Sequence, residues 1–258
     1  MDIYTIQSGH RSGIYNMALD EALLEHVRHQ AEPLLIVRTY RWEVPTLSLG
    51  VNQQVRDIRF LLEFYGKHSG CAEPVKAVVR RPTGGRAILH GQDISYSFIT
   101  NEPAVLRQSL KDSYAMYAGI VRDTLARLAL AVNFTDSAGD RDYLRSPVCF
   151  ETHTSSDLVG EDGKKLTGSA QLRRTGGLLQ HGAAFLEPYG ISEAQFYQAL
   201  TESTASTLKQ SAQPCPVTLL DNLKPLRLEL EALYWKESGE ILDSASTING
   251  SHLVPASC

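Results

Sequence analysis

The chain of 258 residues contains few cysteines, and their spacing argues against a disulfide framework. No two of the 4 cysteines form a CxxC pair, and the 8 histidines include no HExxH pattern and no close Cys/His spacing. Widely spaced cysteines are typical of proteins from reducing compartments. We therefore expect no structural or catalytic zinc, and free thiols at four positions. These positions are Cys71, Cys149, Cys215 and Cys258.

The sequence also lacks a long apolar run, a basic excess and a recognisable targeting segment. No stretch approaches the roughly 18 apolar residues that a membrane-spanning helix needs. The opening MDIYTIQSG has no charged region followed by an apolar run. The net charge of -4 gives no sign of a nucleic-acid surface, which favours a basic balance. We expect a cytoplasmic protein with no membrane or nucleic-acid partner.

What the sequence does contain is ordinary for a globular protein. Apolar residues make up 43% and charged residues 21% of the chain, and the length suits one large domain or two small ones. We find no internal repeat and no low-complexity linker. From Glu237 onward the sequence is polar, with Gly, Ser and Asn. We expect one domain over residues 1–236 and a frayed polar tail over residues 237–258.

Apolar patterning predicts short strands that occur in runs and are separated by a few helices. Strands are expected at 3–6, 34–40, 46–51, 75–80, 87–89, 94–100, 131–134, 157–159, 165–171 and 177–185. Helices are expected at 14–29, 104–130, 192–200 and 219–233. Runs of strands without strict βα alternation favour an α+β fold with a mixed, mostly antiparallel sheet packed by helices.

Three details of this pattern are specific enough to test. The strands at 75–80, 87–89 and 94–100 are expected to form a meander that contains a glycine turn. Pro225 is expected to interrupt or start the last helix, because proline lacks the amide proton that a helix interior needs. In the helix 104–130 the apolar residues recur every three or four positions, so Tyr114 and Tyr117 are assigned to packing and to no chemistry.

Two glycine-containing motifs and one cysteine carry the chemical signal. RRPTGGRAILH occupies residues 80–90, KKLTGSAQ occupies residues 164–171, and Cys149 lies between them. Glycines let backbone amides approach a ligand closely, and arginines add fixed charge and donors. A cysteine and a lysine from separate segments form a nucleophile and its activator. Taken one at a time, these pieces are better explained as two surface turns and a small buried thiol.

The order of RRPTGGRAILH, CFE, KKLTGSAQ and LLQHG resembles the lipoate/biotin protein ligase superfamily (the BPL/LPL catalytic domain). Within it, the sequence is most similar to the cysteine-dependent octanoyltransferases of the LipM type. IYNMALDEALLEH and PTLSLG fit as well, and the resemblance fades after about residue 200. It implies the biotin-synthetase-like fold, related to class II aminoacyl-tRNA synthetases.

The resemblance implies an octanoyltransferase of lipoate biosynthesis that uses no cofactor, metal or ATP. The donor would be octanoyl-acyl-carrier protein, and the acceptor a lysine of a lipoyl domain or of glycine-cleavage H protein. Cys149 would carry the octanoyl group as a thioester. Lys165, not Lys164, matches the motif lysine. Asp162-Gly163 predicts a hairpin turn in which Lys164 is solvated, and strand alternation places the two lysines on opposite faces.

The remaining motif residues are expected to bind substrate. For His181, a site role and a purely structural role stay open. These residues are Arg81, Thr83, Gly84, Gly85, Arg86, His90, Gly168, Ser169, Ala170, His181 and Gly182.

Three other functions remain possible from the sequence. An ATP-dependent lipoate–protein ligase shares the RR..GG and K..GSA elements, but Arg86 stands where the ligase pattern has a third glycine. A lipoyl or octanoyl amidotransferase would also use a cysteine, although PTGGR and the CFE setting of Cys149 favour the carrier-protein route. A non-catalytic binding module would make Cys149 and Lys165 incidental. The segment Ser155–Leu158 lacks an expected tyrosine, which leaves the acceptor preference open.

Overall fold

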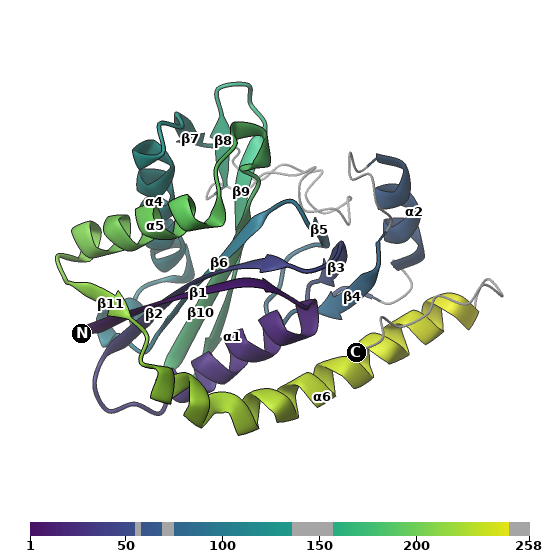
Figure 1. Ribbon diagram of the computed structural model, residues 1–258, viewed down its shortest axis with the longest axis horizontal. Helices are drawn as coiled ribbons and strands as arrows, with labels where there is room; N and C mark the ends of the chain where they lie inside the picture. Colours follow the sequence, from purple (N-terminus) through teal and green to yellow (C-terminus); the bar gives the residue numbers. More distant parts are fainter. Residues whose placement is uncertain (55–57, 69–74, 136–156, 248–258) are drawn as a thin grey trace.

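An eight-stranded sheet forms the centre of the molecule (Figure 1). The computed structural model describes residues 1–54, 58–68, 75–135 and 157–247. The strand order is β11-β1-β2-β6-β10-β9-β8-β7; β1 pairs in parallel with β2 and β11, and the other pairs are antiparallel. The strands are β1 (Asp2–Arg11), β2 (Leu34–Trp42), β6 (Ile94–Thr100), β7 (Val132–Phe134), β8 (Leu158–Gly160), β9 (Lys165–Arg174), β10 (Gly177–Ala184) and β11 (Ala212–Pro214). The predicted α+β class with a mostly antiparallel sheet is confirmed.

Helices cover both faces of this sheet (Figure 1). Helices α1 (Gly13–Val27) and α6 (Val217–Thr247) lie on one face, and α4 (Leu110–Arg127) and α5 (Glu193–Leu208) lie on the other. Successive side chains of a strand point to opposite faces. In β2, Leu35 and Val37 therefore pack into the α4–α5 core, whereas Leu34 and Ile36 pack into the α1–α6 core. This double burial explains why β2 begins with four consecutive apolar residues, Leu34 to Val37.

A second, three-stranded sheet stands beside the first. Its order is β4-β3-β5, from β4 (Ala77–Arg80), β3 (Thr46–Leu49) and β5 (Ile88–His90), with β3 and β4 parallel. The predicted meander is therefore wrong, because β5 pairs with β3 and β6 joins the large sheet between β2 and β10. Helix α2 (Ile58–His68), which the sequence pattern did not indicate, packs on this small sheet.

The helix predicted over residues 104–130 is two helices. Helix α3 (Pro103–Leu106) ends at Arg107, and α4 begins after Ser109. The backbone of Ser109 is extended, and its hydroxyl accepts a hydrogen bond from the Asp112 amide at 3.1 Å. Such a cap satisfies a free donor of the first turn, and its extended backbone stops a helix from running through. An apolar stripe alone does not reveal this break, because both helices keep the same spacing.

Helix α6 runs without interruption through Pro225 to Thr247. Pro225 is exposed, so the carbonyl that it leaves unpaired faces water, which reduces the cost of an internal proline. The predicted polar tail is helical up to residue 247, because this part packs on the body of the protein. Glu237 pairs with Arg80 at 2.8 Å, and Ile241 is buried against the small sheet.

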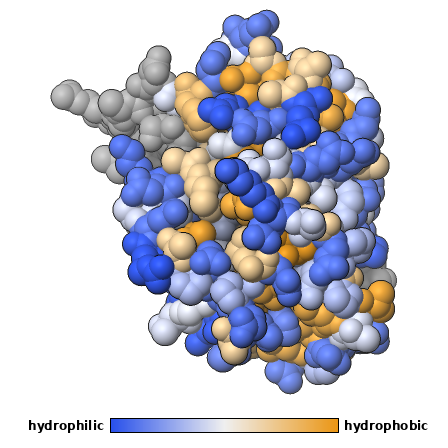
Figure 2. All heavy atoms as spheres, turned by 90° about the vertical axis from the view of Figure 1, so that its left-hand side faces the viewer, coloured by the Kyte–Doolittle hydropathy of each residue, from blue (hydrophilic) through white to orange (hydrophobic). Residues whose placement is uncertain are grey.

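The side that carries α4 and α5 is mainly hydrophilic, with smaller hydrophobic areas between the polar residues (Figure 2). A short 3-10 helix, Glu187–Tyr189, links β10 to α5. Within the described ranges, no helix is both long and apolar enough to span a bilayer.

Candidate active site

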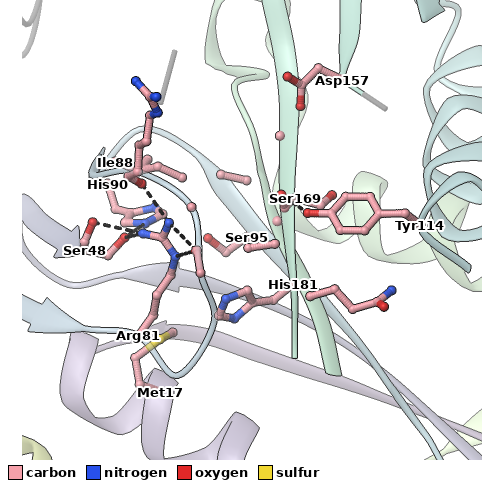
Figure 3. A pocket seen from close by; sticks show the side chains of 18 of the residues that line it. Met17, Ser48, Arg81, Ile88, His90, Ser95, Tyr114, Asp157, Ser169 and His181 are labelled. Atoms are coloured by element: carbon pink, nitrogen blue, oxygen red, sulfur yellow. Dashed lines mark hydrogen bonds between the residues drawn. The ribbon is translucent and has the colours of Figure 1, made fainter. Parts of the chain in front are cut away.

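A cavity of about 530 Å³ opens where the small sheet meets β9, β10 and the start of α4. It brings together most of the residues that the sequence analysis selected, although they come from segments up to about a hundred residues apart. Figure 3 shows several of them around the cavity. The selected residues on its wall are Arg81, Gly84, Gly85, Arg86, His90, Lys165, Gly168, Ser169, Ala170, His181 and Gly182. Thr83 lies next to this wall and contacts His181.

The loop after β4 folds around the side chain of Arg81. Its guanidinium donates hydrogen bonds to the carbonyls of Gly84 at 2.8 Å and Arg86 at 2.7 Å. It also donates to the carbonyl of Ser48 on β3 at 3.1 Å. Arg81 is only 4% exposed. The fork of donors that the sequence assigned to a ligand thus fixes the shape of the loop that lines the cavity.

Gly85 is required by this loop. Its φ of +87° lies in the left-handed region, and an added Cβ would stand 2.9 Å from Nη2 of Arg81. The carbonyl oxygen of Gly85 also leaves no room for a side chain at Gly50 on the neighbouring loop, because a Cβ there would lie 2.0 Å from this oxygen. Glycine is the residue that permits both the backbone angle and the close approach. Gly85 and Gly50 therefore have a structural reason that is independent of any ligand, whereas an added Cβ at Gly84 would meet nothing within 4 Å.

His90 is held rigidly at the cavity wall. Its Nδ1 lies 2.9 Å from Asp93 Oδ2, its Nε2 lies 2.8 Å from Ser48 Oγ, and its ring stacks on Trp42 with centroids 3.9 Å apart. Burial raises the pKa of Asp93, but the charge and hydrogen bond of His90 and the donors of Ser95 and Gly91 outweigh it and lower that pKa. Asp93 is therefore an acceptor at neutral pH, and His90 links the small sheet to the cavity.

His181 anchors the other side of the loop through Thr83. His181 Nε2 lies 2.6 Å from Thr83 Oγ1, and its Nδ1 lies 3.3 Å from Asp20 Oδ2 on α1. Burial lowers the pKa of His181, despite Asp20, which acts in the opposite direction. The ring is therefore neutral at pH 7, with its proton on Nδ1 toward the carboxylate, so that Nε2 accepts from the Thr83 hydroxyl. The structure thus gives His181 a positioning contact with the RRPTGG loop.

Asp20 accepts the buried end of this hydrogen-bond network, and it was not selected from the sequence. Burial raises the pKa of Asp20, but the charge of Arg38 and the hydrogen bonds of His181 and Arg38 outweigh it and lower that pKa. Arg38 Nη1 donates to Asp20 Oδ1 at 2.7 Å, and both side chains are fully buried. One signal was present in the sequence: Asp20 shares the buried stripe of α1 with Met17 and Leu24, at spacings of three and four.

Lys165 and Lys164 differ as strand alternation predicts. The Lys164 side chain is 83% exposed and pairs with Asp162 at 3.2 Å. The Lys165 side chain is 3% exposed, lines the cavity, and lies 2.7 Å from Asp157 Oδ2. The turn between β8 and β9 contains Gly163 at φ +74°, and it reverses the chain as the Asp162–Gly163 pair predicts. Asp157, like Asp20, was not selected from the sequence.

The strand that follows Lys165 forms a wall of small residues. A Cβ at Gly168 would stand 2.9 Å from Lys165 Cε, so Gly168 makes space for the lysine side chain. The Ser169 hydroxyl lies 2.9 Å from the Tyr96 hydroxyl, and burial raises the Tyr96 pKa to about 12. Tyr114 reaches the same strand from α4, and its hydroxyl donates to the Ser169 carbonyl (Figure 3). The assignment of Tyr114 to packing alone is therefore wrong, because its ring end lines the cavity.

The predicted nucleophile, Cys149, lies outside the described residues, as do Cys71 and Cys258. Cys215 is described; it lies between β11 and α6 and is not among the residues that line the cavity. Burial raises the pKa of the Cys215 thiol to about 11. A thiol with so high a pKa is mostly protonated at pH 7 and is a poor nucleophile. Among the described residues, no cluster of His, Cys, Asp or Glu could hold a metal ion.

Comparison with known proteins identifies a matching family and similar chains. Residues 12–234 match the lipoyl protein ligase A/B catalytic domain family. The chain is 38% identical to octanoyltransferase LipM of Lysinibacillus sphaericus over 192 residues, 71% of this chain and 66% of that protein. It is 35% identical to octanoyltransferase LipM of Bacillus subtilis over 190 residues, 70% of this chain and 64% of that protein. It thus spans just under two thirds of the length of these relatives.

The fold is also that of solved lipoate–protein ligases. A crystal structure of lipoate-protein ligase A bound with ATP superimposes with a TM-score of 0.67 at 19% identity, covering 90% of this chain and 95% of that one. The putative lipoate protein ligase Ta0514 from T. acidophilum gives a TM-score of 0.65 at 19% identity, covering 89% and 94%. At this level of identity the likeness establishes the architecture alone.

Proposed function

The chain belongs to the lipoyl protein ligase A/B catalytic domain family, and from this premise we propose that it is an octanoyl-[acyl-carrier-protein]:protein N-octanoyltransferase. One observation carries the proposal. A chain up to 38% identical to octanoyltransferases has a buried lysine, Lys165, on the wall of a mainly apolar cavity, beside a strand of small residues. A cytoplasmic location fits a reaction that depends on a reduced thiol.

The reaction has two steps, and each exchanges one acyl bond. The Cys149 thiolate attacks the thioester carbonyl of octanoyl-acyl-carrier protein, and the carrier leaves as a pantetheine thiolate that takes up a proton. The neutral amine of the acceptor lysine then attacks the Cys149 thioester. The nitrogen loses a proton, the amide forms, and the cysteine thiolate is regenerated. The proteins that accept the octanoyl group in this reaction are lipoyl domains and glycine-cleavage H protein.

Lys165 supplies the positive charge that this reaction needs. Negative charge develops on the carbonyl oxygen during both attacks, and a fixed cation in a water-poor cavity stabilises it. The same ammonium favours the thiolate form of a nearby cysteine. No metal and no nucleotide takes part, because the thioester of the donor already carries the activation.

The cavity suits an acyl chain of moderate length. Gly168 and Gly182, on the neighbouring strands β9 and β10, line it without side chains of their own. Met17, Ile88 and Trp42 add apolar surface to the same cavity. Burial of each methylene contributes roughly 0.8 kcal/mol, so that an octanoyl chain supplies several kcal/mol of binding.

The test is intact mass spectrometry after incubation with octanoyl-carrier protein in the absence of ATP. We expect a stable octanoyl adduct on Cys149, none on Cys215, and transfer to apo H protein when it is added. The Cys149→Ala variant should lose the adduct, whereas Cys215→Ala should keep it. An adduct at the wild-type level in Cys149→Ala would refute the proposed nucleophile.

The same assay separates the rival functions. Modification of H protein from free octanoate and ATP, with none from octanoyl-carrier protein, would identify a ligase. Transfer only from octanoylated H protein would identify an amidotransferase, and no acyl adduct with any donor would leave a binding module. Arg86 argues against the ATP-dependent ligase function, because its long side chain on the cavity wall would crowd a nucleotide phosphate.

Lys164 offers a matched control for Lys165. Lys165→Ala should slow single-turnover acylation of Cys149 by about 10²–10³-fold, the usual size of an electrostatic or acid–base contribution. Lys164→Ala removes the same charge from the solvent-exposed face and should change the rate by less than about two-fold. Equal and mild effects of both changes would show that Lys165 is not part of the chemistry.

A further inference from the structure

Asp157 and Lys165 form a buried ion pair on the cavity wall. Oδ2 of Asp157 lies 2.7 Å from Nζ of Lys165, and the two side chains are 5% and 3% exposed. Asp157 immediately precedes β8 and Lys165 opens β9, so the β8–β9 hairpin brings the two residues together. Both side chains line the cavity that holds the motif residues (Figure 3 labels Asp157).

Stability of the fold does not explain this pair. Removing two charges from water carries a large desolvation cost, and replacing a buried pair by apolar residues is often neutral or stabilising. The buried pair of Arg38 and Asp20 connects β2 with α1. Asp157, just before β8, and Lys165, at the start of β9, instead lie at strands that already pair through their backbones. Their position on the cavity wall points to a role in the cavity.

The surroundings fix the ammonium at one place. Lysine has a flexible four-carbon chain, so a lysine charge without a firm partner samples many positions. Here the chain lies over Gly168, where an added Cβ would come within 2.9 Å of Cε and 3.2 Å of Nζ. The same Cβ would stand 3.5 Å from Asp157 Oδ1. The glycine surface therefore supports the lysine side chain, and the carboxylate holds its end.

We propose that Asp157 is a positioning residue for acyl transfer, whose carboxylate keeps the Lys165 ammonium at a fixed point of the cavity wall. This inference rests on the proposed function. Charges that are held in place before the reaction stabilise a transition state without a cost of reorganisation. Asp157 acts on the rate through Lys165, and its loss lowers the acylation rate while donor binding stays the same.

The experiment is single-turnover acylation by octanoyl-carrier protein at varied donor concentration. Asp157→Asn keeps the shape and removes the charge, and we expect a loss of about 10–100-fold in the maximal rate with half-saturation within two-fold. Asp157→Glu keeps the charge but moves it by one methylene, and we expect at least a five-fold loss. The matched control is Asp162→Asn, which breaks the exposed pair with Lys164 and should leave the rate unchanged.

A double-mutant cycle distinguishes positioning from a general structural effect. In a Lys165→Met background, Asp157→Asn should change the residual rate by less than two-fold, because a positioning residue has nothing left to position. A further loss of five-fold or more in this background would overturn the inference. A wild-type rate in Asp157→Asn or in Asp157→Glu would overturn it as well.

The variants also separate this inference from the proposed function. If Lys165→Met keeps the wild-type rate, the role of Lys165 itself is wrong. If Lys165→Met is inactive while Asp157→Asn is fully active, only the role of Asp157 is wrong. Should Asp157→Asn fail to fold because it removes the negative charge beside a buried lysine, Asp157→Glu retains both charges and decides the question alone.

Discussion

Gly182 is the position where the structure predicts the sharpest effect of a single methyl group. It lies in the middle of β10, directly between Tyr96 of β6 and Ser169 of β9 in the strand register. A Cβ added there would stand 2.5 Å from the Tyr96 hydroxyl oxygen, 2.6 Å from Tyr96 Cζ and 2.6 Å from the Gly168 carbonyl oxygen. Unstrained contacts between carbon atoms lie at about 3.5–4.0 Å, so three atoms overlap by roughly 1 Å.

Neither neighbour can yield at low cost. Tyr96 is 1% exposed, packs edge-on against Phe98, and shares a hydrogen bond with Ser169. The Gly168 oxygen belongs to the backbone of the adjacent strand. Overpacking a close-packed site typically costs about 1–3 kcal/mol. Because three atoms overlap at once, one of them in the backbone, we expect Gly182→Ala to lower the free energy of unfolding by about 3 kcal/mol, the upper end of this range.

The assay is thermal unfolding with Gly84→Ala as the matched control. For a protein of this size, 1 kcal/mol corresponds to about 2–4 °C, so Gly182→Ala should lower Tm by roughly 6–12 °C. Gly84 lines the same cavity, but an added Cβ there has no neighbour within 4 Å and its φ is ordinary. Gly84→Ala should therefore stay within about 2 °C of wild type. A Tm for Gly182→Ala within 2 °C of wild type would refute the packing argument.

Two further predictions concern stability. Gly119→Ala in α4 should raise the free energy of unfolding by about 0.5–1 kcal/mol, because an added Cβ meets nothing within 4 Å and glycine costs helix stability; a fall in Tm would contradict this. Burial lowers the pKa of His181, so below its unfolded value of 6.5 the unfolded chain binds a proton that the folded protein does not. Stability should therefore fall as pH drops below 6.5, by up to about 1.4 kcal/mol per pH unit, and His181→Gln should flatten this slope between pH 6.5 and 5. The control is His26→Gln, because burial also lowers the pKa of His26 but this variant keeps the contribution of His181. An unchanged slope of stability against pH in His181→Gln would disprove that His181 causes it.

Two buried networks hold the loop between β4 and β5 from opposite sides. Through Arg81 the loop is fixed to Ser48, which in turn contacts His90. Through Thr83 it is fixed to His181. A loop held at both ends keeps its backbone in one conformation without a ligand, which lowers the cost of ordering it when a substrate binds. The histidines of the two motifs therefore stabilise the cavity wall.

Secondary structure was predictable from the sequence wherever the pattern is local. The apolar stripe of α1, the alternation in β9 and the turn at Asp162–Gly163 all depend on residues within a few positions of one another. For the same reason the sequence correctly placed Lys164 in solvent and Lys165 on the inner face. The motif order also sufficed to select residues that line one cavity, because it indicated the family.

The contacts between these segments, by contrast, follow from the three-dimensional fold. The pairing of the strands depends on the burial of both faces of the large sheet. No local pattern shows that β5 belongs to the second sheet. The partners of the cavity residues are equally remote: Asp20 is 161 positions from His181, and Thr83 is 98 positions away. Sequence spacing reveals contacts along one element, whereas contacts between elements depend on strand order. The acidic residues that hold the site, Asp20 and Asp157, were therefore found only in the fold.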